Sequence, residues 1–223
     1  MQNKLTADTG KLANASIAKG DITGWFEELY HNAGGDPSII PWADQKPNPY
    51  LIEWLDENKI NGEGKTALVI GCGLGDDAEE LQRRGYNVTA FDISQTAIEW
   101  AKKRFPDSGV EYHVADLFDL PKQWLGAFDF IFECYTIQAL PRSVRTEVID
   151  KVASLAAPNG LLLIFCRGWH NDQTEDTLPW ALKKEELRQF KELGFSEISF
   201  EQFWDRDDSD RYRFRVLYKK RII

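Results

Sequence analysis

A glycine-rich segment followed by an acid is the part of this sequence best suited to bind a ligand. In residues 71–75 every second residue is glycine, after the apolar run 67–70 and before a helical pattern over 76–84. A second apolar run over 87–91 leads directly to Asp92. Glycines let the backbone turn tightly and approach a ligand, and an acid at a strand end can accept hydrogen bonds from ribose hydroxyls. The pattern therefore predicts the first half of a nucleotide-type binding unit.

The spacing of the glycines discriminates between ligands. A dinucleotide site needs Gly-x-Gly-x-x-Gly, with the pyrophosphate at the helix N-terminus. Here the spacing is Gly71-x-Gly73-x-Gly75, and Asp76 takes the third dinucleotide position. Asp76 and Asp77 suit the helix dipole but repel a pyrophosphate. A ligand without phosphate and with a positive centre fits better, and S-adenosylmethionine is such a ligand. A nicotinamide or flavin site, or a tight turn with no cofactor, are the alternatives.

Acids end three consecutive predicted strands, at Asp92, Asp116 and Glu133. Open α/β sheets bind ligands at the carboxyl ends of their strands. Asp92 suits the ribose hydroxyls, and Asp116 suits the adenine amino group, with Leu117 and Phe118 beside the ring. Glu133 would lie near a sulfonium or an amino group. The alternative for each acid is an exposed strand-end residue or a helix cap.

The composition of the chain argues against several classes of protein. The chain has 223 residues, which is enough for one α/β domain with a full core. Its net charge of −9 argues against non-specific binding to nucleic acid or to an anionic membrane. Three scattered cysteines argue against a disulfide framework and a zinc site, so we expect no metal. The longest apolar run, 161–166, is too short to cross a bilayer, and no signal peptide is visible, so we expect a cytoplasmic protein.

Alternating strand and helix patterns predict a parallel sheet with helices on both faces. The last two strands should pair antiparallel because the turn over 205–210 is too short for a crossover. Residues 1–40 are expected to form an N-terminal arm and cofactor lid, with 41–223 as the main domain. We expect strands over 67–70, 87–91, 110–115, 128–132, 161–166, 195–203 and 211–218, and helices over 21–30, 50–58, 76–84, 94–104, 142–157 and 182–193.

The chain resembles the class I S-adenosylmethionine-dependent methyltransferases. More narrowly, it resembles the thiopurine S-methyltransferase family and its thiol and halide methyltransferase relatives. The resemblance covers roughly residues 25–218 and implies a single Rossmann-like domain with a seven-stranded, mostly parallel sheet and one antiparallel strand. It rests on Trp42 with Pro47 and Pro49 behind it, on the segments 67–75, 85–86, 92–94, 116–121 and 128–133, and on 139–141.

The resemblance also implies roles for individual residues. Trp25 and Trp42 would cover the cofactor, the glycine loop would line its methionine part, and Glu133 and Tyr135 would face the donor sulfur and the acceptor. The predicted cofactor-binding residues are Trp25, Trp42, Gly71, Cys72, Gly73, Gly75, Asp92, Ile93, Asp116, Leu117, Glu133 and Tyr135.

Two positions depart from the family pattern. Val69 stands where the superfamily often has an acid, so the amino end of the cofactor is expected to contact backbone carbonyls or another acid. Cys134 stands where thiopurine enzymes carry an arginine, which argues against a thiopurine acceptor.

The sequence therefore predicts a methyltransferase that acts on a small molecule, such as a thiol or another soft nucleophile. Catalytic residues are not identified, and Tyr135 and His170 are weak candidates. A nicotinamide-dependent oxidoreductase and a non-catalytic cofactor-binding module are the alternatives.

Overall fold

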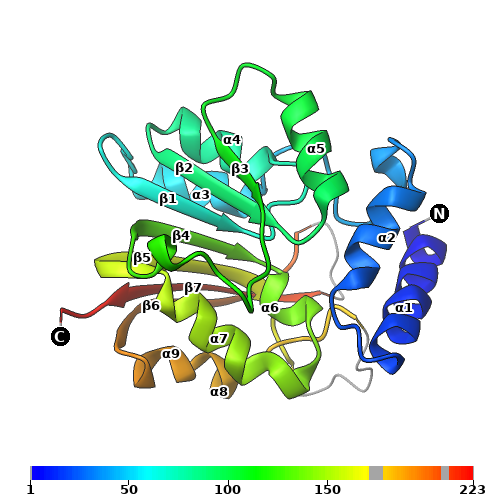
Figure 1. Cartoon of the computed structure of the whole chain (residues 1–223). Coiled ribbons are helices and arrows are strands. Elements are labelled where there is room, and N and C mark those ends of the chain that lie inside the picture. The colour runs from blue at the N-terminus through cyan, green and yellow to red at the C-terminus, as the bar shows by residue number, and fades with distance from the viewer. Residues whose placement is uncertain (1, 171–177, 207–210, 223) are drawn as a thin grey trace. The chain divides into compact units, whose positions relative to one another are not determined.

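Seven strands form one mixed sheet in this computed structural model, which describes residues 2–170, 178–206 and 211–222 (Figure 1). The strand order is β3-β2-β1-β4-β5-β7-β6. Strand β7 runs antiparallel to both β5 and β6, and the predicted mostly parallel sheet with one antiparallel strand is confirmed. The strands are β1 (Thr66–Ile70), β2 (Asn87–Asp92), β3 (Glu111–Val114), β4 (Phe128–Cys134), β5 (Ala156–Arg167), β6 (Phe195–Trp204) and β7 (Tyr212–Lys220).

The helices of the chain differ widely in length. The α-helices are α1 (Gln2–Ala18), α2 (Gly24–Asn32), α3 (Pro49–Glu57), α4 (Asp76–Arg83), α5 (Gln95–Arg104), α6 (Thr136–Ala139), α7 (Arg145–Ser154), α8 (Lys184–Leu187) and α9 (Gln189–Glu192). Short 3-10 turns cover Pro37–Ile39, Lys122–Trp124 and Arg142–Val144.

The chain divides into two compact units. Unit 1 comprises residues 1–65 and 71–116, and unit 2 comprises 66–70 and 117–223. We describe each unit by itself. The predicted lid segment 1–40 stays a prediction.

Unit 1 contains helices α1 to α5 and strands β2 and β3. Helix α2 contacts α1 and α5 (Figure 1). Local capping fixes the helix starts: Asn48 accepts a hydrogen bond from the Tyr50 amide at α3, and the Ser94 hydroxyl accepts one from the Ala97 amide at α5. The predicted Ser94 cap is therefore confirmed.

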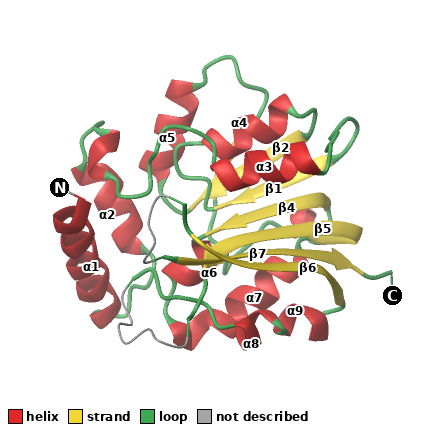
Figure 2. Ribbon diagram, turned by 180° about the vertical axis from the view of Figure 1, so that it is seen from behind, coloured by secondary structure: helices red, strands yellow, loops and turns green. Residues whose placement is uncertain are grey.

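Unit 2 contains strands β1, β4, β5, β6 and β7 with helices α6 to α9. Helices α7, α8 and α9 lie together on one side of these strands (Figures 1 and 2). Its core is strongly apolar, and strands β4 and β5 supply fully buried Phe132 and Ile164. Strand β7 follows β5 as its neighbour, so its first residues lie beside the carboxyl end of β5.

Several predicted element boundaries were wrong. The predicted helix over 142–157 ends at Ser154, and β5 already begins at Ala156. Pro158, Asn159 and Gly160 do not form a loop before the strand, because Ala156 pairs with Phe128 and the ladder then shifts its register. The three residues form an irregularity within β5, with Asn159 at φ 65°.

The predicted helix over 182–193 is split into α8 and α9. The Tyr218 hydroxyl donates a hydrogen bond of 2.9 Å to the Leu187 carbonyl. The Lys191 amide bonds instead to the Arg188 carbonyl, one residue closer than an α-helix requires. The predicted turn over 205–210 lies partly outside the described residues.

Candidate functional site

The glycine loop of unit 1 requires glycine at alternate positions. Gly71, Gly73 and Gly75 have φ angles of 60°, 52° and 91°. A Cβ atom on Gly73 would lie 3.0 Å from the Tyr30 hydroxyl oxygen, and one on Gly75 would overlap the Tyr112 ring. The loop therefore combines a left-handed backbone with close approach, and only glycine satisfies both.

The amides of this loop are largely bonded within unit 1. The Cys72 amide donates to the Phe91 carbonyl at 2.9 Å, and the Gly75 amide donates to the Cys72 carbonyl at 3.0 Å. The Gly73 amide donates to Asp92 Oδ2 at 2.9 Å. These bonds fix the shape of the loop, so side chains and carbonyls must supply part of any ligand contact.

Asp92 is the last residue of β2, one residue beyond the predicted strand, and its carboxylate is oriented by backbone amides. Oδ2 accepts from Gly73 and Oδ1 accepts from the Ser94 amide, each at 2.9 Å. The residue is 7% exposed, and burial raises the pKa of its carboxyl. The Ile93 amide also interacts with this carboxylate. A carboxylate can accept about four hydrogen bonds, so Asp92 keeps capacity for a ribose hydroxyl.

The two acids at the start of α4 are held by the protein. Arg104 binds Asp76 through both terminal nitrogens, at 2.7 and 2.8 Å. Asp77 Oδ1 accepts from the Asn48 amide at 2.7 Å, and burial raises its pKa to about 7. The negative charge that we expected at this helix start is therefore partly balanced by Arg104.

An aromatic cluster in unit 1 includes both predicted tryptophans. The rings of Trp25 and Trp42 meet edge to face at 6.1 Å. Trp42 is 41% exposed, and its Nε1 donates to the Tyr30 hydroxyl at 2.8 Å. Trp25 is 1% exposed, and its Nε1 has no hydrogen-bond partner among the described residues. Tyr30 connects this cluster to Gly73.

Glu27 on α2 is a polar anchor that the sequence analysis missed. Its carboxylate accepts from the hydroxyls of Ser94 and Thr96, both at 2.6 Å, and from the Thr96 amide at 3.0 Å. Burial raises the pKa of Glu27, but these hydrogen bonds outweigh it and the net shift is downward. These bonds attach helix α2 to Ser94 and Thr96, which follow Asp92 closely in the chain. The only sign of this role in the sequence was a glutamate within a predicted helix that is rich in aromatic residues.

The remaining predicted residues of unit 1 lie near the strand ends. Asp116 follows β3 and is half-buried, as are Ile93 and Cys72. Burial, followed by the charge of Asp92, raises the pKa of the Cys72 thiol well above its usual value. Cys72 is therefore a thiol of low nucleophilicity. Leu117 is buried and belongs to unit 2.

Glu133 lies inside β4 rather than after it, because the strand continues to Cys134. Its side chain is fully buried, and Oε1 accepts from the Ile137 amide at 2.9 Å, at the start of α6. Oε2 has no partner in the part of the chain that the structure describes. Burial raises the pKa of this carboxyl to about 7. The helix-cap alternative is therefore correct for one oxygen, while the other is open.

The two weak catalytic candidates belong to unit 2 and contact different aromatic rings. Tyr135 follows β4 at φ 65°, and its ring meets Phe165 at 5.6 Å. His170 contacts the rings of Trp204 and Tyr212, each at 5.0 Å. Burial raises the pKa of the Tyr135 hydroxyl well above its usual value. The structure does not show the two acting together.

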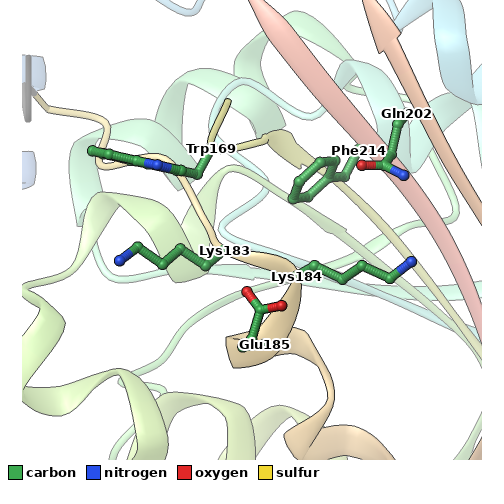
Figure 3. Close-up of a pocket in the computed structure, with 6 residues that line it drawn as sticks. All are labelled: Trp169, Lys183, Lys184, Glu185, Gln202 and Phe214. Atoms are coloured by element: carbon green, nitrogen blue, oxygen red, sulfur yellow. The ribbon is translucent and has the colours of Figure 1, made fainter. Parts of the chain in front are cut away.

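Unit 2 also has a surface pocket of about 300 Å³. Figure 3 shows Trp169 and Lys183 extending alongside one another, with Lys184 directed toward the opposite side. The pocket is lined by Trp169, Lys183, Lys184, Glu185, Gln202 and Phe214. None of the predicted cofactor-binding residues lines it.

The described residues offer neither a metal-binding cluster nor a membrane-spanning helix. Among residues 2–170, 178–206 and 211–222, no three His, Cys, Asp or Glu side chains are grouped so that they could hold a metal ion. No helix in those ranges is both long enough and apolar enough to cross a bilayer.

Comparisons with known proteins show similarity to methyltransferases. Residues 67–160 match a family described as a methyltransferase domain. A ubiquinone biosynthesis O-methyltransferase of Dechloromonas aromatica is 32% identical over 145 residues, which cover 62% of this chain and 59% of that protein. A 2-heptyl-1-hydroxyquinolin-4(1H)-one methyltransferase of Mycobacteroides abscessus is 26% identical, covering 63% of each protein. The match thus spans less than two thirds of these relatives.

Solved structures share the fold at low identity. An N-methyltransferase from Bradyrhizobium japonicum, solved with S-adenosyl-L-homocysteine, has a TM-score of 0.68 at 19% identity, covering 86% of this chain and 98% of that one. A 1,6-didemethyltoxoflavin-N1-methyltransferase from Burkholderia thailandensis has a TM-score of 0.68 at 17% identity, covering 94% and 89%.

The comparisons do not show the narrower resemblance to thiopurine S-methyltransferases, which stays a prediction. The fold, the glycine loop and the matched segment agree with one another. Residues 67–160 of this chain match a methyltransferase domain, and the fold is shared with solved methyltransferases.

Proposed function

We propose that the chain is an S-adenosylmethionine-dependent methyltransferase of small molecules. The observation that carries the proposal is the glycine loop of unit 1, with three left-handed glycines between β1 and α4 and the Asp92 carboxylate bonded to its centre. This loop lies inside the matched segment.

The residues of unit 1 fit the cofactor chemically. Asp92 offers acceptor positions for the ribose hydroxyls, and Asp116 offers a carboxylate for the adenine amino group. Trp25 presents a buried, unpartnered N–H, and such a donor normally has an acceptor. The cofactor carboxylate is an acceptor of this kind. Trp42, Gly71, Cys72, Gly73, Gly75 and Ile93 would complete the contacts from unit 1, and Leu117, Glu133 and Tyr135 those from unit 2.

When bound, the cofactor supplies a methyl group on a sulfonium, so the chemistry needs little from the protein. The chain positions the acceptor and excludes water, effects that can contribute on the order of 7–11 kcal/mol. A thiol of low pKa needs no base, whereas an oxygen acceptor with a higher pKa is helped by one. The two relatives named above are described as acting on oxygen or on a quinolone, and we extend the proposed acceptors to aromatic hydroxyl groups.

The wider setting is also a proposal. The net charge of −9 supports a small-molecule acceptor over nucleic acid or a membrane surface. We propose a cytoplasmic enzyme because none of the three cysteines forms a disulfide.

Calorimetry tests the proposal. We expect S-adenosylhomocysteine to bind and reduced nicotinamide dinucleotide not to bind, because Asp76 occupies the third glycine position. Binding of the dinucleotide alone would favour the oxidoreductase alternative. Binding of S-adenosylhomocysteine without methyl transfer to a panel of thiols, phenols and amines would favour a non-catalytic module.

A further inference from the structure

Arg213 on β7 is a buried arginine with unused hydrogen-bond donors. The residue is 6% exposed, and its Nε donates to Asp205 Oδ2 at 2.9 Å. In the described part of the chain, its terminal nitrogens form no hydrogen bond. Arg215 differs, because both its Nε and a terminal nitrogen bind Glu201, at 3.2 and 2.7 Å. The terminal nitrogens are not among the buried unpartnered atoms of the described residues, so solvent reaches them and they can donate to another acceptor.

The surroundings of Arg213 are aromatic. Its guanidinium carbon lies 5.2 Å from the centre of the Tyr135 ring and 5.9 Å from that of Phe165. Phe165 in turn stacks on Phe203 at 6.3 Å. Tyr135 follows β4, while Phe165 and Phe203 belong to β5 and β6, so the three rings form a wall rather than a single contact.

The cluster lies at the carboxyl edge of the parallel strands. Arg213 is directly opposite Arg167, the last residue of β5, and Tyr135 follows the last residue of β4. Ligands of open α/β sheets bind at this edge. Tyr135 also has φ 65°, which is unfavourable for a residue with a side chain, and such residues gather at functional sites.

We propose that Arg213 binds the carboxylate of a planar aromatic methyl acceptor, whose ring packs against Tyr135 and Phe165. The proposal rests on the proposed methyltransferase function and adds the chemical class of its substrate. A guanidinium fork matches a carboxylate with two parallel hydrogen bonds, and aromatic rings pack edge to face or offset. Asp205 holds the Nε side of the group, so the terminal nitrogens stay directed to the ligand.

The lysine pocket of Figure 3 is the rival site for an aromatic anion. Lys183 lies over the Trp169 ring at 5.4 Å, and Lys184 lies over Phe200 at 4.4 Å. Phe214, which lines that pocket, follows Arg213 directly in β7, so their side chains point to opposite faces of the sheet. The two sites can therefore be separated by mutation.

Ligand-observed NMR on the full chain tests the proposal with salicylate and its neutral amide, salicylamide, with and without saturating S-adenosylhomocysteine. We expect salicylate to bind about tenfold more tightly, since a bidentate charged pair is lost with the amide. The double variant Arg213→Gln, Asp205→Asn removes both members of the ion pair, and we expect it to lose this preference. Arg215→Gln is the matched control and should keep it.

The other outcomes of this experiment distinguish the Arg213 site from the pocket of Figure 3, and the substrate class from the cofactor proposal. Equal binding of the two probes, or binding of neither, overturns the substrate class while leaving the cofactor proposal intact if S-adenosylhomocysteine binds. A preference that Arg213→Gln keeps and Lys183→Gln, Lys184→Gln loses assigns the anion to the Figure 3 pocket and also overturns the proposal. If S-adenosylhomocysteine does not bind, the methyltransferase function fails, and salicylate binding alone still decides whether Arg213 holds an anion.

Discussion

The glycine loop of unit 1 and the strand ends of unit 2 differ in whether their polar groups have hydrogen-bond partners within the protein. In the loop, the amides of Cys72, Gly73 and Gly75 all bond to groups of the same unit. At the strand ends, Glu133 Oε2 and the terminal nitrogens of Arg213 have no partner among the described residues. A loop whose shape is fixed suits a ligand of constant structure, such as a cofactor. Polar groups without partners suit a substrate, which they can recognise by its own polar groups. We therefore propose that the glycine loop of unit 1 holds the cofactor in a fixed shape, and that the open polar groups of unit 2 help to select the acceptor.

The largest effect should come from breaking the rigid loop. Gly75→Ala combines a φ of 91° with overlap on Tyr112, so we expect a loss of about 3 kcal/mol or more in unfolding free energy, measured with urea. Gly64→Ala is the control, because Gly64 has φ 73° but open space around it. It should cost only about 1–2 kcal/mol. Equal losses in the two variants would show that close packing at the loop is unimportant.

Glu133 should give stability a pH dependence of known sign. Its folded pKa of about 7 lies above the unfolded value of 4.5, so the folded state binds more protons between these values. The stabilising contribution is complete below the unfolded pKa and is lost as the pH rises through the folded pKa, by about 3 kcal/mol. Urea unfolding from pH 5 to 8 should therefore show a shallower decline in Glu133→Gln than in the wild type.

A control for the Glu133 experiment is available in unit 1. Asp77 has a pKa raised by burial to about 7, so Asp77→Asn should flatten the same pH dependence. The two carboxyls differ in their surroundings, because Glu133 Oε2 is fully buried without a partner among the described residues, whereas Asp77 is only half-buried. An unchanged pH slope in both variants would contradict the burial of these carboxyls.

Asp92 should affect both affinity and stability. Asp92→Ala removes the proposed ribose acceptor, and we expect S-adenosylhomocysteine to bind about 1.5–3 kcal/mol more weakly in calorimetry. The Gly73 amide also loses its partner, which should cost about 1–3 kcal/mol of stability. Asp76→Asn weakens the pair with Arg104 but should leave affinity unchanged. Normal affinity in Asp92→Ala would remove this residue from the site.

The smallest effects are expected from substituting Trp25 and Trp42, and they should show which of the two contacts the ligand. Trp42→Phe loses a hydrogen bond to Tyr30 and should cost about 0.5–1.5 kcal/mol of stability. Trp25→Phe loses no hydrogen bond of the described chain, so it should be less destabilising but should weaken S-adenosylhomocysteine binding. The opposite assignment, with affinity lost only in Trp42→Phe, would place the ligand contact on Trp42.

The order of helices and strands could be predicted from the sequence, because the spacing of apolar residues and the capping residues act locally. Ser94 caps its helix as predicted, and the tight turn predicted from the glycine spacing has positive φ angles at Gly71, Gly73 and Gly75. The irregular start of β5 was missed because it depends on pairing with Phe128. The division of α8 from α9 depends on Tyr218, which is remote in sequence.

The candidate site was predictable only in part. Asp92 lies at its expected strand end, but its bonds to two amides depend on how the loop folds back. Tyr30 and Glu27 were missed because their partners, Trp42 and Ser94, lie on other elements, and the sequence shows only that both belong to the predicted helix over 21–30. Arg213 resembles any arginine of a half-exposed strand until its burial and single acid partner are known.

A crystal structure with bound S-adenosylhomocysteine is the most direct test of the central claim, that the glycine loop and Asp92 hold a nucleoside without phosphates. We predict both ribose hydroxyls within hydrogen-bond distance of the Asp92 carboxylate, with that carboxylate still bonded to Gly73. Ligand density elsewhere, or Asp92 in contact with backbone amides alone while the ligand is absent from the loop, would contradict the account.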